Sequence, residues 1–241
     1  MCKRFFVDES IQGQCVNITG EENNHLVNVL RMKVGDKIIV NCGDEYDYIC
    51  TITEMEKRLT RCTINDKVIN AFNPTKQIDV FQSLIKNDKM AIVTQKLNEI
   101  GVSNLKLFET KFQTVKPSEN KQDKLQKISN QSAKQCKRSI PMQVSSILTF
   151  NEMLVQLNEY DIILFANECE KTVVLQEVLD KLQSVSSVAI IIGSEGGFSA
   201  EEIDAIMNNS RVESVSLGSR ILRAETASIV LSGFVSLYMN N

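Results

Sequence analysis

The chain has 241 residues, of which 43 % are hydrophobic and 24 % charged. This ordinary globular composition excludes a largely disordered chain, and the length suits one large domain or two small ones. The formal net charge of −3 taken alone argues against a nucleic-acid-binding protein. The seven cysteines are odd in number and form no Cys-x-x-Cys pair, so free thiols in a reducing compartment are expected rather than disulfides or a zinc site.

The N-terminal sequence MCKRFFVDES lacks the apolar stretch of a secretory signal. The longest apolar tract, TASIVLSGFVSLYM, is too short to span a bilayer and contains Ser and Gly. We therefore expect a cytoplasmic protein that has no membrane segment and binds no metal.

The first seventy residues read mostly as strands. Short runs of β-type or alternating residues predict strands at 4–7, 15–18, 37–41, 46–53 and 59–65. Between the second and third of these, Thr19 followed by Glu22 is a capping-box signature, and residues 25–30 carry apolar side chains at helical spacing. His25, the single histidine, lies on a helix that also carries apolar residues and is expected to be structural. Several strands with one helix predict a small β-barrel over residues 1–72.

Beyond Phe72-Asn73-Pro74, which has the character of a linker, strands alternate with helices. The predicted strands are 77–84, 105–108, 162–166, 188–192 and 212–217; the predicted helices are 88–100, 120–136, 150–156, 173–182 and the tract that follows 225. Such alternation is typical of an α/β domain with a parallel sheet. We assign this second domain to residues 73–241.

Basic residues gather in one stretch of this acidic chain. Residues 111–141 contain eight Lys or Arg side chains, opposed only by Glu119 and Asp123. Such a local excess indicates either a phosphate-facing surface or a solvated, lysine-rich helix face.

A glycine-rich loop follows the buried strand 188–192. It reads Gly-Ser-Glu-Gly-Gly over residues 193–197, after which Ser199 and Glu202 form a second capping box. Ligands of open α/β sheets bind beyond the carboxyl ends of the strands. The loop has neither the lysine of a phosphate-binding loop nor the dinucleotide fingerprint, and Ile192 excludes a nucleophile elbow. A ligand-binding loop and a plain turn that needs glycine for its geometry both remain open.

A second polar loop, 218–225, leaves the same predicted edge of the sheet. It contains Arg220 and Arg223 around an Ile-Leu pair and is followed by an apolar helix. An ordinary surface ion pair between Arg223 and Glu225 is the alternative interpretation. Because two such loops meet at one edge, we expect a binding site there.

Together these loops resemble the RsmE family of small-subunit rRNA uridine-N3 methyltransferases, in the SPOUT class of α/β-knot enzymes. The resemblance covers nearly the whole chain, and its most specific parts are GSEGGFSAEE and LGSRILRAETA. It also includes RFFV, HLVNVLRMKVGD, QKLNEIGV and the QCKR segment before Pro141.

The resemblance implies a fold, a cofactor and a substrate. Residues 1–72 should form a PUA-like β-barrel that binds RNA, and residues 73–241 a SPOUT domain with a deep trefoil knot, an exception to the rule that chains are unknotted. The substrate should be 16S rRNA within the assembled small ribosomal subunit. The enzyme should be a homodimer that uses the knot and the apolar helix 226–239. The methyl donor S-adenosylmethionine (SAM) should be bound by Ile192, Gly193, Ser194, Glu195, Gly196, Gly197, Leu217, Gly218, Ser219, Ile221, Leu222, Ala224 and Thr226.

Chemistry limits the catalytic candidates. The uracil N3 proton must be removed, and negative charge then spreads to the flanking carbonyl oxygens. Arg220 or Arg223 is expected to stabilise that charge, and Glu195 or Glu225 to accept the proton or hold an arginine. N3 lies on the pairing edge, so the base must be unpaired or flipped out.

Four further basic residues are the candidates for RNA backbone contacts: Arg4, Arg31, Lys137 and Arg138. Two alternatives remain open, namely an RNA-binding assembly protein without turnover and a knot methyltransferase that modifies another base or RNA. A Rossmann-type small-molecule enzyme is disfavoured because its fingerprint is absent.

The chain departs from the family pattern at three places. Ser194 stands where the family usually has proline, Lys134 where an acidic residue is common, and residues 111–114 (KFQT) where an Arg-Ser segment is frequent.

Overall fold

The computed structural model describes residues 2–7, 11, 13–118, 120–167 and 175–239. They form two compact units, one containing the residues up to Asn73 together with Ala133–Pro141, the other Pro74–Ser132 and the residues from Met142 onward. The sequence division assigns residues 133–141 to the second domain, whereas in the structure they pack with the first unit. Hydrogen bonds that Asn70 and Asn73 make with this segment account for the difference.

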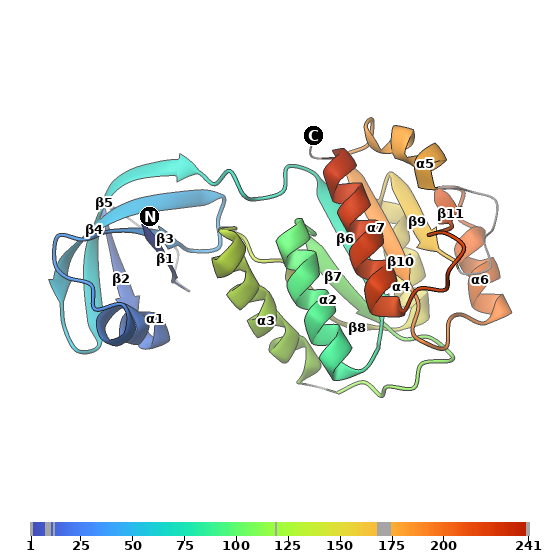
Figure 1. Ribbon diagram of the computed structural model, residues 1–241, viewed down its shortest axis with the longest axis horizontal. Coiled ribbons are helices and arrows are strands. Elements are labelled where there is room, and N and C mark those ends of the chain that lie inside the picture. The colour runs from blue at the N-terminus through green and yellow to red at the C-terminus, as the bar shows by residue number, and fades with distance from the viewer. Residues whose placement is uncertain (1, 8–10, 12, 119, 168–174, 240–241) are drawn as a thin grey trace. The chain divides into compact units, whose positions relative to one another are not determined.

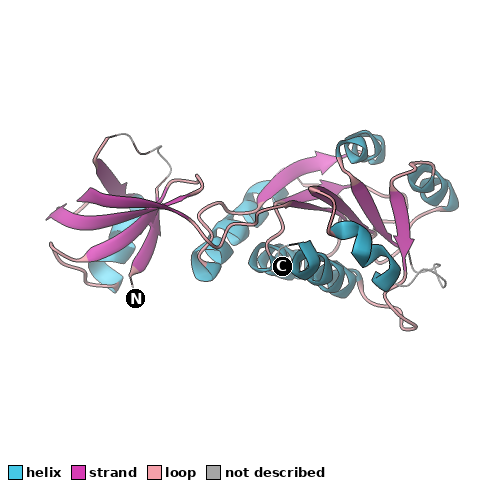
Figure 2. Cartoon of the chain, turned by 90° about the horizontal axis from the view of Figure 1, so that it is seen from above, coloured by secondary structure: helices cyan, strands magenta, loops and turns pink. Residues whose placement is uncertain are grey.

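The first unit is built on a mixed five-stranded sheet (Figure 2). Its strands are β1 (Lys3–Phe6), β2 (Cys15–Thr19), β3 (Lys37–Asn41), β4 (Tyr46–Met55) and β5 (Leu59–Ile69). The order is β1-β3-β4-β5-β2, with β1 parallel to β3 and the other pairs antiparallel. Alternate side chains of these strands, among them Phe5, Ile18 and Ile38, fill one core. Because β1 and β2 are edges in the described pairing, the expected barrel is a half-barrel.

The helical segment of this unit differs from its sequence pattern. Helix α1 (Gly20–Asn24) continues directly into a π-helical turn, η1 (His25–Val29). Thr19 is the N-cap by position, but its side chain makes no capping hydrogen bond, so the predicted capping box is wrong. The Glu22 carboxylate instead accepts from the Phe6 N–H at 3.4 Å and pairs with Lys134.

The π turn also changes which side chains of this helix are buried. In a π turn each hydrogen bond joins residues five apart in the chain. The buried face of the helix is therefore not the one that a 3.6-residue period predicts. Leu26 is fully buried, whereas Val29 is 65 % exposed. His25 is exposed and lies beside the Phe5 ring.

The second unit is a three-layer α/β domain (Figure 1). Its strands are β6 (Gln77–Ser83), β7 (Asn104–Phe108), β8 (Gln143–Leu148), β9 (Ile162–Ala166), β10 (Ser187–Ile192) and β11 (Val212–Val215). All pair in parallel, in the order β11-β9-β10-β6-β7-β8. The sequence pattern missed β8, because its alternation is broken by Ser145 and Ser146.

Helices cover both faces of this sheet. They are α2 (Asn87–Ile100), α3 (Lys121–Cys136), α4 (Phe150–Gln156), the 3-10 turn η2 (Leu157–Glu159), α5 (Leu175–Leu182), α6 (Ala200–Met207) and α7 (Ala224–Met239). One core joins the sheet to α2, α3, α5 and α7, and the other joins it to α4, η2 and α6. Two predicted residues of α5, Val173 and Val174, lie outside the described residues.

Two local signals of the sequence are confirmed in this unit. Gly101 ends α2 in the left-handed conformation, with φ 102°, where glycine carries no steric penalty. Ser199 and Glu202 form a complete capping box at the start of α6. Among the described helices, none has the length and apolar character that a membrane crossing requires.

Candidate functional site

A cavity of about 780 Å³ opens at the carboxyl ends of the second unit's strands. Parallel strands bring all their carboxyl ends to one edge, so the loops after several strands converge there. The lining includes Lys86 after β6, Thr114 after β7, Asn167 after β9, the loop after β10 and the loop after β11. The size lies within the range of about 300–1,000 Å³ that is typical of small-molecule sites.

The glycine loop after β10 is held against neighbouring segments. A Cβ on Gly193 would lie 2.8 Å from Cε2 of Phe198, and one on Gly196 only 2.5 Å from the backbone oxygen of Phe112. Gly197 has a φ of 68° and donates its N–H to the Ser194 carbonyl at 3.0 Å. Glycine is therefore required for close packing at two positions and favoured by the backbone conformation at the third.

Ser194, which replaces the proline usual in the family, has its own contacts. Its side chain is buried, and Oγ lies 3.4 Å from Oγ1 of Thr110, which in turn lies 2.9 Å from Oγ of Ser83. This row of hydroxyls links the end of β6 to the loops after β7 and β10. The serine thus fixes the loop through hydrogen bonds where proline would fix φ.

Residues 111–114 close one side of the glycine loop. The Lys111 N–H donates to Oε1 of Glu202 at 2.8 Å, while Oε2 of Glu202 accepts from the Ser199 N–H. Glu202 therefore caps α6 and anchors the segment whose Thr114 lines the cavity. This departure from the family pattern therefore bears on the pocket.

Charged side chains line the mouth of the cavity. Glu195, Arg220 and Arg223 are exposed. Glu225, by contrast, has a side chain that is 13 % exposed, and its Oε1 lies 3.4 Å from Nζ of Lys89. Glu225 thus pairs with a lysine of α2 and not with Arg223, so the simple surface pair considered as the alternative is not what the structure contains.

Most of the predicted donor-binding residues line this cavity. They are Ile192, Gly193, Ser194, Glu195, Gly197, Leu217, Gly218, Ser219, Ile221, Leu222 and Ala224, together with all four catalytic candidates, Glu195, Arg220, Arg223 and Glu225. Gly196 and Thr226 are not part of the lining. Gly196 packs against Phe112, and Thr226 is exposed on the first turn of α7.

The sequence analysis missed several lining residues: Lys86, Lys89, Thr114, Ala166, Asn167, Phe198 and Ile203. Lys86 and Lys89 follow the end of β6 directly, so the rule that ligands bind beyond the strand ends provides a signal for them. Applying this rule to Lys86 and Lys89 requires knowledge of the strand order, which places β6 next to β10.

Burial argues against two of the four predicted RNA contacts. Arg4 donates to Asp47 at 2.5 and 2.9 Å, and its side chain is 9 % exposed. Arg138 is 3 % exposed, donates Nε–H to the Ile140 carbonyl, and burial lowers its pKa to about 10. Arg31 is exposed and Lys137 is half-buried, so only these two present their charges to solvent.

The basic stretch 111–141 is likewise less open than its charge suggests. Lys121 is 4 % exposed, and burial lowers its pKa. Lys111 pairs with Glu201, and Lys134, which stands where the family favours an acid, pairs with Glu22. Lys121, Lys134 and Arg138 therefore serve the fold, whereas Lys116, Lys124 and Lys127 are exposed.

Comparisons with known proteins assign the chain. Residues 72–236 match an RNA methyltransferase domain and residues 18–68 an RNA methyltransferase PUA domain. The ribosomal RNA small subunit methyltransferase E of Buchnera aphidicola subsp. Acyrthosiphon pisum is 30 % identical over 94 % of this chain and 90 % of its own. That of Bacillus subtilis is 26 % identical over 97 % and 96 %.

The fold agrees with these assignments. A Legionella pneumophila structure in complex with the bound cofactor SAM superposes with a TM-score of 0.85 at 25 % identity, covering 100 % of this chain and 99 % of the other. The expected combination of a PUA-like unit and a SPOUT α/β-knot unit is confirmed. The chain belongs to the RNA methyltransferase family that includes the ribosomal RNA small subunit methyltransferases E, the RsmE family.

Proposed function

We propose that this chain transfers a methyl group from SAM to N3 of a uridine in 16S rRNA. The observation that carries the proposal is the cavity of about 780 Å³ where the two glycine-containing loops meet, in a chain whose family is RNA methyltransferases. The relatives are named for the small-subunit ribosomal RNA, and the Legionella structure contains SAM.

The composition of the cavity suits this donor. Apolar side chains, among them Ile192, Leu217 and Leu222, form a surface for the adenine ring, and charged groups at the mouth suit the amino and carboxylate groups of its methionine part. Gly218, with a φ of 105°, has no atom within 4 Å of an ideal Cβ position, so the backbone there is open to a ligand. When bound, the donor supplies an electrophilic methyl group on a sulfonium.

The acceptor must become anionic, and the charged residues can serve that step. Arg220 and Arg223 are the candidates to stabilise charge on the uracil oxygens. We assign proton removal at N3 to Glu195, because this carboxylate is exposed at the mouth. Glu225 is held by Lys89, and we assign it the positioning of the loop that carries Arg220 and Arg223.

The partners follow from the substrate. We propose that the enzyme acts in the cytoplasm on 16S rRNA within the small ribosomal subunit, and that it does so as a homodimer. The dimer is supported by two apolar side chains of α7 that are exposed to solvent in the single chain: Phe234 is 47 % and Leu237 64 % exposed.

Calorimetric titration with SAM tests the pocket. Wild-type protein is expected to bind saturably, and Gly197→Trp to lose binding because the indole would occupy the cavity. Gly197 has a φ of 68°, so Gly35→Trp, at a φ of 93° in the first unit, is the matched control for backbone strain and should bind as wild type. No binding to wild type, or equal loss in both variants, would contradict the assigned pocket.

The product tests the reaction. Small subunits from cells lacking this gene, incubated with the protein and SAM, should yield 3-methyluridine after digestion of the 16S rRNA to nucleosides. A different methylated nucleoside would overturn the assignment of N3. RNA binding without any methylated product would instead favour the non-catalytic alternative.

A further inference from the structure

Phe72 and Lys137 form an aromatic–cation pair on the surface of the first unit. Phe72 is 50 % exposed, and Nζ of Lys137 lies 5.2 Å from the centroid of its ring. This distance lies within the roughly 6 Å over which a cation interacts with a ring face. No ion pair involving Lys137 occurs among the described residues. The ammonium is therefore available to an outside partner.

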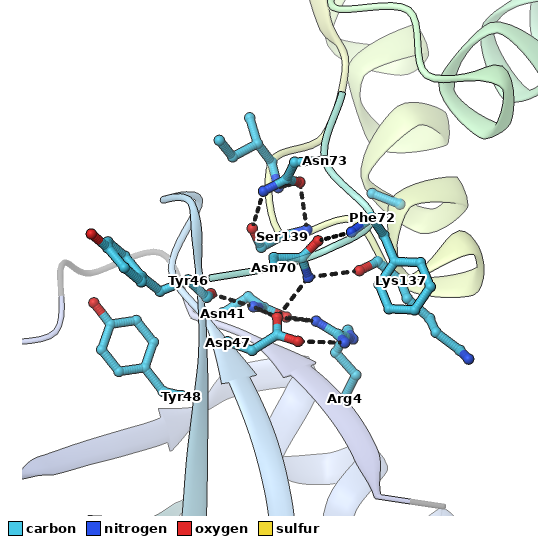
Figure 3. A network of polar contacts seen from close by, with 12 residues as sticks. Arg4, Asn41, Tyr46, Asp47, Tyr48, Asn70, Phe72, Asn73, Lys137 and Ser139 are labelled. Atoms are coloured by element: carbon cyan, nitrogen blue, oxygen red, sulfur yellow. Dashed lines mark hydrogen bonds and ion pairs between the residues drawn. The ribbon is translucent and has the colours of Figure 1, made fainter. Parts of the chain in front are cut away.

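One buried side chain sets the positions of both members of the pair. Asn70 is 3 % exposed; its Oδ1 accepts the Phe72 N–H at 2.9 Å, and its Nδ2 donates to the Lys137 carbonyl at 3.0 Å. Figure 3 shows Asn70 between these two backbone segments, with the Phe72 ring beside the Lys137 side chain. Two segments far apart in sequence thus meet through one amide group.

Asn70 is itself held by a network of charged and polar groups. Nδ2 of Asn70 also donates to Oδ1 of Asp47 at 2.7 Å, and Asp47 accepts from Arg4 and from Asn41 (Figure 3). Burial opposes ionisation of Asp47, but the hydrogen bonds from Arg4, Asn70 and Asn41 outweigh it, so its pKa is lowered. The carboxylate therefore stays charged at neutral pH and holds the network together.

Two further features make the pair rigid. Lys137 has a φ of 69°, a left-handed conformation that a side chain with a Cβ adopts only when its surroundings impose it. Asn73, which follows Phe72, is hydrogen-bonded to the segment that follows Lys137. Its Oδ1 accepts from the N–H groups of Ser139 and Ile140, each at 3.1 Å. The backbone segments that carry the ring and the cation are thus held in place, so less conformational entropy is lost on binding.

We propose that Phe72 and Lys137 form a stacking platform for an unpaired RNA base, with Lys137 contacting the phosphate beside it. This inference rests on the proposed function, because it names residues that would hold the same RNA. Single-stranded nucleic acids bind where aromatic side chains that stack with bases lie beside cations that meet the backbone. Asp47, the carboxylate of this network, is paired with Arg4. The positive charge of Lys137 therefore remains to attract a polyanion.

Tryptophan fluorescence provides a direct test, because the chain contains no tryptophan. The variant Phe72→Trp introduces a single indole at the platform. Titration with a short oligouridylate should quench its emission, whereas inorganic polyphosphate, which has charge but no bases, should not. Equal quenching by both polymers, or by neither while the protein binds the oligonucleotide, would overturn the proposal.

Affinities measured with a labelled oligouridylate separate stacking from charge. Phe72→Ala should weaken binding about 5- to 150-fold, the loss expected for one stacked base. Lys137→Ala should weaken binding and flatten the dependence of log K on log salt by about 0.7, the value for one phosphate contact on a single strand. Ile69→Ala, which removes a neighbouring side chain that is 73 % exposed, is the control and should bind as wild type.

The outcomes separate this inference from the proposed function. If wild type binds SAM and methylates rRNA but Phe72→Ala binds the oligonucleotide as tightly as wild type, the stacking proposal is wrong. A protein partner would then be the remaining candidate for this surface. If wild type forms no methylated product while Phe72→Ala still weakens RNA binding, the platform stands and the catalytic proposal fails. Thermal unfolding of each variant confirms that the fold is intact.

Discussion

Glu195 and Glu225 line one cavity but have different surroundings. Glu195 is exposed on the glycine loop. The side chain of Glu225 is 13 % exposed and pairs with Lys89 at 3.4 Å. A carboxylate that already holds a cation is suited to orient its loop, whereas a carboxylate free to meet substrate is suited to accept a proton.

These surroundings predict different kinetic effects. Glu195→Gln should lower kcat by about 100-fold or more, the usual contribution of a general base, with little change in the Kd for SAM. Glu225→Gln should mainly weaken SAM binding, by about fivefold, since a partly exposed ion pair contributes about 1 kcal/mol or less.

Lys89→Ala serves as the check, because it breaks the same ion pair from the other side. It should reproduce the effect of Glu225→Gln, and the double variant should lose little more than either single one. Additive losses in SAM affinity, or a kcat that falls more in Glu225→Gln than in Glu195→Gln, would reverse the assigned roles.

At the scale of elements, the start of α6 has two functions. Its capping box pairs the backbone N–H groups of the N-cap residue and of the third helical residue, as does the equivalent box of Thr149 and Glu152 on α4. Only at α6 does the capping glutamate hold a further segment, through the hydrogen bond from the Lys111 N–H to Glu202 at 2.8 Å. This bond fixes the segment that carries Thr114 into the cavity.

The two boxes form a matched pair of test sites. Glu202→Ala and Glu152→Ala should each lower the free energy of unfolding by about 1 kcal/mol, the usual contribution of a capping residue. Only Glu202→Ala should also weaken SAM binding, because it releases residues 111–114. Calorimetry of both variants with SAM measures this difference, and equal affinities would show that the segment does not shape the pocket.

The elements also show what sequence patterns can and cannot predict. Burial on both faces makes β10 a continuous apolar run, and the Ser199–Glu202 box marks the start of α6, so both were predictable. The π turn at His25–Val29 was not, because its hydrogen bonding departs from the 3.6-residue period on which the pattern rests. The contribution of Lys89 to the cavity was missed because it depends on strand order, which local periodicity does not encode.

At the scale of the whole molecule, α7 presents uncovered apolar side chains. Phe234 and Leu237 are exposed while Leu231 and Val235 of the same helix are buried in the core. The resulting helix is apolar on more than one side, which favours burial against a second surface.

The proposed dimer is therefore sensitive to charge on this helix. Leu237→Glu should shift the protein from dimer to monomer in light scattering coupled to size-exclusion chromatography, because the dimer would bury an unpaired carboxylate. Val155→Glu, at a side chain of α4 that is 69 % exposed, is the control and should leave the mass unchanged. A monomeric wild type, or the same shift in both variants, would exclude α7 as the interface.

The assignment of Ala133–Pro141 to the first unit has a consequence for how such a protein can be rearranged in evolution. The backbone passes between the two units after Asn73, after Ser132 and after Pro141. Recombination at the first junction alone would transfer an RNA-binding module without the peptide that Asn70 and Asn73 bind. An exchange that keeps the first unit intact must therefore carry residues 133–141 along with residues 1–73.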